Sequence, residues 1–347
     1  MQPDSNTAEQ YPLAMMLCGG GHQYASLLGS YQAVLDRGRS PDLLIATCGG
    51  AIIANLICRL QNNTERLDWL SSTAMYRFYS SQHAGPGNQL LKMLPAALAR
   101  KLSARASKNP PDLFNTWLFD FSEPFPTLPD LTDNAPDLLI IGSQLHYSAA
   151  QLTAPVPAPS TTQQLFSETV FSNARVAKLL HNQGAAMASH SPRIAKKLVI
   201  QQDICSLLAM RISVADCYYY APVTLGAHVY AGGLINLFPS EIALRCAKSV
   251  IAQPKADFDT LLATPAIRHV FAFDPQRRLE QYHRCSQLDW LPEVAPKPEL
   301  ANLRKHFDWR TGQLQLQLDS YLEFKQQVYS QYQWGYQSTI AATERSS

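Results

Sequence analysis

The sequence predicts an α/β protein of three layers, in which a mainly parallel sheet lies between helices. Two observations carry this prediction. Apolar runs of strand length at 12–18 and 43–46 are each followed by glycines and then by a segment with helical spacing. This strand–helix–strand–helix order is typical of a parallel βαβ unit. In such a sheet a binding site is expected at the carboxyl ends of the strands.

The composition is that of one large domain. Of the 347 residues, 46% are hydrophobic and 16% are charged, which favours a sizeable core over disorder. Residues 1–10 are polar and are expected to form a disordered tail, so that 11–347 make up a single domain. The formal net charge of +2 does not select nucleic acid as a partner.

The cysteines and the N-terminus bear on location and cofactors. Seven cysteines at irregular spacing, without a C-x-x-C pair, are typical of reduced thiols in a cytoplasmic protein. A secretory signal and a run of 18 apolar residues are both missing. We therefore expect a cytoplasmic protein, or one bound peripherally to a membrane, and we expect no metal and no other cofactor.

The segment 61–160 is expected to be a variable insert within the domain. Residues 61–108 hold seven Lys or Arg and two acids, and their leucines recur at helical spacing: Leu91, Leu94, Leu98 and Leu102. One interpretation is a helix packed on the domain with a solvated basic face; the other is a lid or membrane-contacting helix. Beyond it, proline-rich connections surround one predicted strand at 138–142.

The remaining elements are predicted from apolar runs and helical spacing. Apolar runs predict strands at 169–172 and 270–273. The alternating run 313–318 fits either a strand or the start of a helix. Helices are predicted at 192–212, 239–252 and 321–332.

Three glycines, Gly19, Gly20 and Gly21, stand between the first strand and the first helix. Consecutive glycines let backbone N–H groups point into one small space, and the N-terminus of the helix adds positive potential. Such a loop binds a phosphate or stabilises an oxyanion.

The segment from Ala46 to Gly50 has the layout of a nucleophile elbow. An elbow is a strained strand-to-helix turn that holds one side chain out, and it needs small neighbours. It makes Cys48 the candidate nucleophile. Because a helix N-terminus lowers the pKa of a thiol, we expect an increased thiolate fraction. The alternative is a small buried residue tolerated in a tight turn.

A third segment, from His228 to Pro239, ends a strand, turns on Gly232 and Gly233 and enters a helix. Together the three segments resemble the patatin-like phospholipase family, whose pattern is G-G-G-x-[RK]-G, then G-x-S-x-G, then D-G-[GA] with a following asparagine and proline. The resemblance covers roughly residues 12–60 and 200–252. It implies a patatin-like α/β/α fold.

The resemblance also implies chemistry. Family members are lipid acyl hydrolases in which a serine attacks an ester carbonyl, an aspartate takes the proton and the glycine loop holds the oxyanion. Carried over, Cys48 is the nucleophile position and Ala231 is the dyad-acid position, where the acid is lost. The oxyanion-hole glycines are Gly19, Gly20 and Gly21. Further departures from the pattern are Gln23, Tyr24 and Ala46.

A cysteine nucleophile often works with a histidine. His22, in the glycine loop, is the first candidate partner of Cys48, and His228 is the second. Asp203 and Asp216 are weaker candidates for an acid.

Two functions stay open. One is a lipid acyl hydrolase or acyltransferase that acts on an ester or acyl-thioester through Cys48 without a cofactor. The other is a pseudoenzyme that binds lipid or a protein partner without turnover. A reactive thiol beside an open pocket would favour the first.

Overall fold

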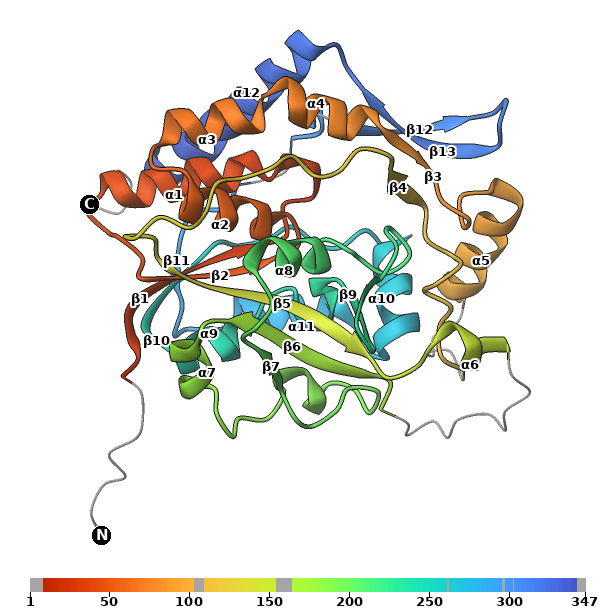
Figure 1. Cartoon of the computed structure of the whole chain (residues 1–347), viewed down its shortest axis with the longest axis horizontal. Helices are drawn as coiled ribbons and strands as arrows, with labels where there is room; N and C mark the ends of the chain where they lie inside the picture. Colours follow the sequence, from red (N-terminus) through yellow and green to blue (C-terminus); the bar gives the residue numbers. More distant parts are fainter. Residues whose placement is uncertain are drawn as a thin grey trace.

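The structure, a computed structural model, describes residues 9–102, 109–153, 164–260, 262–294, 297–301 and 303–341. Most of the expected tail, residues 1–8, therefore lies outside the described residues. The centre is a sheet of order β11-β10-β1-β2-β5-β6-β7, with β9 beside β5 and β8 beside β9 (Figure 1). Its strands are β1 (Tyr11–Cys18), β2 (Leu43–Thr47), β5 (Asp137–Leu145), β6 (Phe166–Ser172), β7 (Val199–Gln201), β8 (Val223–Leu225), β9 (His228–Ala231), β10 (Ala247–Ala252) and β11 (Asp289–Trp290).

Helices cover both faces of this sheet, so the predicted three-layer α/β/α fold is confirmed. The strands from β11 to β5 run parallel, whereas β6 and β9 are antiparallel to β5. One layer holds α1 (Ala25–Asp36), α2 (Gly49–Arg59), α3 (Asn63–Leu70), α4 (Thr73–Ser80), α8 (Ser206–Ser213) and α12 (Tyr321–Ala341). The other holds α7 (Ala174–Leu179), α9 (Ser240–Cys246), α10 (Ala263–Phe271) and α11 (Pro275–His283).

Strand β1 shows why the apolar runs predicted strands correctly. Met16 and Cys18 pack into the core on one face of the sheet, and Met15 and Leu17 into the core on the other. A strand covered on both faces has no polar face, so it reads as a continuous apolar run.

Small elements border one end of the sheet. A hairpin of β12 (Leu303–Asp308) and β13 (Gln313–Leu318) confirms the strand interpretation of the alternating run. Residues 61–160 form β3 (Gln82–Ala84), β4 (Phe119–Phe121), α5 (Leu90–Leu102) and α6 (Ala149–Thr153), besides α3, α4 and the central strand β5. No described helix is long and apolar enough to cross a membrane, and all seven cysteines are free.

Three predicted elements are wrong. The stretch 192–212 forms β7 and α8, and 239–252 forms α9 followed by β10, because pairing to the neighbouring strands outweighs weak helical spacing. Residues 270–273, predicted as a strand, begin as the last turn of α10. An apolar run this short does not distinguish a buried helix end from a strand.

Two glycines allow α1 and α12 to pack closely. A Cβ at Gly29 would lie 2.0 Å from the carbonyl oxygen of Tyr332, and one at Gly335 would lie 2.0 Å from that of Ser26. The C-terminal helix can therefore reach the backbone of α1 only because both positions lack a side chain.

This packing gives a test of the layer over α1. Gly335→Ala should lower the free energy of unfolding by about 1–3 kcal/mol, because the added methyl group overpacks the contact. Urea denaturation measures the change. Gly184→Ala is the matched control, since its Cβ would meet only the Lys196 carbonyl oxygen at 3.4 Å. Equal effects of both substitutions would contradict the close-contact interpretation.

Candidate active site

The turn after β2 is a nucleophile elbow in its geometry. Cys48 lies between β2 and α2 with φ 49° and ψ −125°, a conformation rare for a residue with a side chain. Such strain persists only where the surrounding structure imposes it, and it is often found at functional sites. The expectation of a strained turn at Cys48 is thereby confirmed.

Two glycines after Cys48 make the turn possible. A Cβ at Gly50 would lie 1.9 Å from the carbonyl oxygen of Leu17, and one at Gly49 would lie 2.8 Å from that of Gly19. Helix α2 can therefore begin against the end of β1 only with glycine at both positions.

The end of α8 holds Cys48 at two points. The Cys48 amide donates a hydrogen bond to Ser213 Oγ over 2.9 Å. Three residues further on, Asp216 Oδ1 accepts a hydrogen bond from the Cys48 thiol over 3.1 Å. One short segment thus fixes the strained backbone and supplies a carboxylate to the thiol.

Asp216 lies beside the family's dyad-acid position. Strand β2 pairs with residues 137–140 of β5, and β9 pairs with residues 143–145 of the same strand. The end of β9 therefore lies close to the elbow that follows β2. Gly232, which follows Ala231, donates its N–H to the Ala215 carbonyl over 2.7 Å. A Cβ at Gly232 would lie 2.5 Å from Asp216 Oδ1. A neighbouring turn therefore brings a carboxylate next to the position where Ala231 lacks one.

The pKa values of Cys48 and Asp216 are both raised, whereas the sequence predicted a lowered pKa for the thiol. Burial raises the pKa of the Asp216 carboxyl to about 7, although the hydrogen bond from Cys48 acts to lower it. Burial and the charge of Asp216 raise the pKa of the Cys48 thiol well above its ordinary value, while the Gly233 N–H acts in the opposite direction. The predicted thiolate enrichment is therefore wrong, because desolvation and a nearby carboxylate outweigh the helix N-terminus.

The glycine loop has three consecutive left-handed residues, with φ 63° at Gly19, 104° at Gly20 and 51° at Gly21. The Gly19 N–H donates to the carbonyl and the hydroxyl oxygens of Thr47, at 3.1 and 3.2 Å. Among the described residues, none accepts a hydrogen bond from the Gly20 or Gly21 amide. Of the three predicted oxyanion donors, Gly20 and Gly21 therefore have amides available.

The two residues after the loop that depart from the family pattern have other contacts. The Gln23 side chain donates to the Lys297 carbonyl over 2.6 Å and accepts from the Lys297 amide over 3.1 Å. The Tyr24 hydroxyl is hydrogen-bonded to that of Tyr79, and Tyr24 lines the cavity described next. Both side chains join the loop to neighbouring segments.

A cavity of about 970 Å³ opens at the carboxyl ends of the strands and is lined by the glycine loop, Cys48 and Asp216. This volume is at the upper end of the range for small-molecule sites. Aromatic and aliphatic side chains form much of its wall, among them Ile52, Phe78, Phe121, Phe125, Met210 and Leu234. The described residues contain no group of three or more His, Cys, Asp or Glu that could hold a metal.

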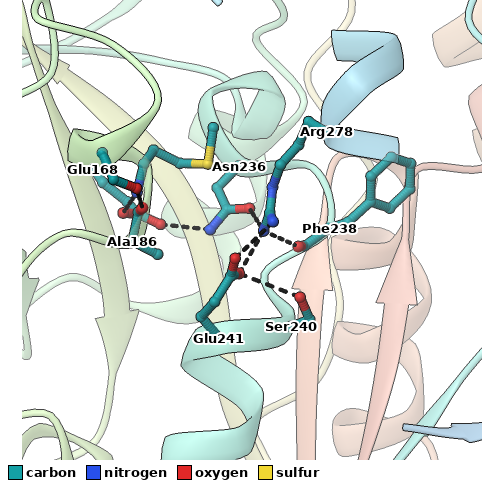
Figure 2. A network of polar contacts seen from close by, with 9 residues as sticks. Glu168, Ala186, Asn236, Phe238, Ser240, Glu241 and Arg278 are labelled. Carbon is teal, nitrogen blue, oxygen red and sulfur yellow. Dashed lines mark hydrogen bonds and ion pairs between the residues drawn. The ribbon is translucent and has the colours of Figure 1, made fainter. Parts of the chain in front are cut away.

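A buried polar network holds the turn after β9 (Figure 2). Asn236 donates to Glu168 over 2.6 Å and accepts from Arg278 over 3.4 Å. Arg278 also donates to the Phe238 carbonyl over 3.0 Å and pairs with Glu241. Burial raises the pKa of Glu168, which has two donors, Asn236 and the Met187 amide. This network fixes the segment whose Gly233 N–H faces the thiol.

The predicted partners of Cys48 have different outcomes. His22 lies in a short 3-10 helix, Gly21–Gln23, but its side chain is outside the described residues, so its role stays a prediction. His228 is exposed and its Nδ1 lies 2.9 Å from Gln144 Nε2; it does not line the cavity. Asp203 is exposed and does not line it either. Asp216 is the acid that the structure brings to the thiol.

Sequence reasoning gave Asp216 too little weight. It looked for the acid at Ala231, the position set by the motif, whereas the acid lies on a different segment in the chain. One signal was present: Asp216 follows an apolar helix and precedes Cys217 and three tyrosines, an unusual setting for a carboxylate.

No model of a known protein family matches this chain, and no curated protein matches it.

The Arg278 network can be tested by removing its central cation. Arg278→Met should lower the free energy of unfolding by about 3–5 kcal/mol, because Asn236, Glu241 and the Phe238 carbonyl lose their donor in a buried setting. The neighbouring Arg277 is exposed, so Arg277→Met should change stability by less than about 0.5 kcal/mol. A small effect of both substitutions in urea denaturation would contradict the role given to Arg278.

The raised pKa of Asp216 predicts a pH-dependent stability. An unfolded aspartate titrates near about 3.9, so ionisation of the folded carboxyl destabilises the fold increasingly as pH rises toward 7. The free energy of unfolding of Asp216→Asn relative to wild type should therefore increase by about 1–2 kcal/mol between pH 5 and pH 8, reduced from full linkage because the cavity hydrates the carboxyl. Asp203→Asn controls for the loss of one charge, and a pH-independent difference for Asp216→Asn would contradict the prediction.

Proposed function

We propose that this chain is a patatin-like acyl hydrolase or acyltransferase in which Cys48 is the nucleophile and Asp216 is its general base. The observation that carries the proposal is the 3.1 Å contact between the thiol and the carboxylate, in a strained elbow at the wall of the cavity. The substrate class is an ester or acyl-thioester of lipid type, since the cavity wall is largely apolar.

The first step follows from the pKa order of the pair. The thiol keeps its proton in the resting site, because its pKa is raised well above normal while that of Asp216 lies at about 7. Sγ attacks the acyl carbonyl as the proton passes to Asp216, which gives a tetrahedral adduct. Asp216 must be ionised to accept the proton, so acylation is expected to accelerate as pH rises through 7.

The negative charge that develops on the acyl oxygen needs donors. The Gly20 and Gly21 amides have no acceptor among the described residues, and both glycines lie in the loop that lines the cavity with Cys48. Preorganised amides of this kind stabilise an oxyanion. When the adduct collapses, the C–O or C–S bond to the leaving group breaks, and Asp216 returns the proton to that group.

The product of this step is an acyl-thioester on Cys48. Water, or another nucleophile with an N–H, O–H or S–H, can then attack the thioester carbonyl while Asp216 again accepts a proton. Attack by water gives hydrolysis and release of an acid, and attack by a different acceptor gives transfer. The thiol is regenerated in both cases, so the cycle needs no metal and no redox partner.

Intact-mass spectrometry tests the proposal. After incubation with a p-nitrophenyl ester or an acyl-CoA, the wild type should carry one acyl group, which hydroxylamine removes. Cys48→Ala should carry none, whereas Cys205→Ala should be acylated like the wild type, since Cys205 is an exposed cysteine that does not line the cavity. An unmodified wild type with every donor, or an adduct that survives Cys48→Ala, would contradict the proposal and favour a non-catalytic lipid-binding role.

A further inference from the structure

Helix α5 lines the cavity with small and basic side chains and exposes leucines on its opposite face. Ala96, Ala97 and Arg100 line the cavity, and the guanidinium of Arg100 lies 3.9 Å from the ring centroid of Tyr218. Leu98 and Leu102, one turn apart on the opposite face, are 56% and 76% exposed. Over its described side chains, the helix thus turns Ala96, Ala97 and Arg100 inward and Leu98 and Leu102 outward.

Among the described side chains of α5, both the leucines Leu98 and Leu102 and the basic residue Lys101 are exposed. An amphipathic helix in water normally buries its leucines and exposes its charges. Over residues 95–102, the outward face of α5 is instead apolar and is flanked by the exposed Lys101, and the helix sequence holds three basic residues and no acid. Such a face suits contact with an apolar layer that carries negative charge.

The β12–β13 hairpin, whose strands line the same cavity, presents a second exposed apolar group at its tip. Its strands line the cavity through Lys305 and Leu314, and its tip carries Trp309, which is 83% exposed. Arg310 follows and is also exposed. Asp308 holds the tip rigid, because it accepts hydrogen bonds from the Arg310 amide and the Thr311 hydroxyl at 2.8 and 2.9 Å.

The hairpin and the segment that leads into α5 are joined. The Asn88 side chain donates to the Leu314 carbonyl over 2.6 Å and accepts from the Leu314 amide over 2.8 Å. In Figure 1, α5 and the hairpin lie at the same end of the molecule. Leu262, at the start of the α10 helix that packs on α5, is 51% exposed and lines the cavity as well.

The distribution of exposed apolar groups is therefore uneven. Among the described residues, six large hydrophobic side chains are strongly exposed. Four belong to the segments that line the cavity, and these are Leu98, Leu102, Leu262 and Trp309. Of these four, Leu262 itself lines the cavity; the other two exposed residues are Leu131, in the loop before β5, and Leu322, on α12.

We propose that the face formed by α5, Leu262 and the β12–β13 hairpin docks on an anionic lipid surface, with the leucines and Trp309 in the interface and Lys101 and Arg310 near the lipid headgroups. A tryptophan beside a cation is suited to the interface between lipid and water, because its ring is apolar and its N–H can donate a hydrogen bond to water. Docking in this way places α5 and the hairpin, which both line the cavity, in contact with the lipid layer.

Vesicle co-sedimentation tests the docking face separately from catalysis. The full chain should sediment with vesicles of phosphatidylcholine and phosphatidylglycerol, bind vesicles of phosphatidylcholine alone more weakly, and lose binding as salt increases. Leu98→Ser with Leu102→Ser, and separately Trp309→Ala, should each weaken binding roughly tenfold or more. Cys48→Ala should bind like the wild type, so a failure of the catalytic proposal leaves this one intact.

Leu322→Ser is the matched control, since Leu322 is 71% exposed on α12, which is not part of the proposed face. It should leave vesicle binding unchanged. Three results would overturn the proposal: no binding to anionic vesicles, an equal loss in Leu322→Ser, or a stable dimer without lipid that dissociates when Leu98 and Leu102 are replaced. The last result would assign the face to a second copy of this chain.

Discussion

The site depends on the hold that the end of α8 has on Cys48. A residue with a side chain at φ 49° is strained, and Ser213 compensates by accepting its amide hydrogen bond. Asp216, from the same short segment, accepts a hydrogen bond from the thiol. The elbow, its backbone support and its acid are therefore positioned by one structural unit, and a shift of that unit would disturb all three together.

The same segment brings a carboxylate next to Ala231, the position where the patatin-like pattern would place an acid. Gly232 packs against Ala215 and Asp216 with no room for a side chain, so the two turns meet directly. The carboxylate of Asp216, in the turn after α8, thus lies next to the turn after β9, where Ala231 has only a methyl group. The cysteine suits this arrangement, since a thiol ionises more readily than a hydroxyl and a carboxylate with a pKa of about 7 is a better base than an ordinary one.

The sequence predicted the parts of this account that are local. Glycines mark the turns after β2 and β9, because a Cβ at Gly50 or Gly232 would lie too close to neighbouring atoms. Apolar runs mark β1 and β2, because helices cover both faces of the sheet. The Asp216 contact and the outward leucines of α5 depend on tertiary packing between distant segments, which local spacing does not encode. The thiol pKa was predicted in the wrong direction for the same reason: the helix N-terminus is visible in the sequence, but the burial of the thiol and the carboxylate beside it are not.

The most direct test of the central claim compares two reactions of Cys48 in Asp216→Asn and in the wild type. If Asp216 is a general base that also holds the thiol protonated, the substitution should lower the rate of acylation by a p-nitrophenyl ester by about 10²-fold or more. It should at the same time raise the rate of alkylation by iodoacetamide at pH 8, because a negative charge beside the thiol is removed. Rates that fall together, or that do not change, would contradict the assignment of Asp216 as the base.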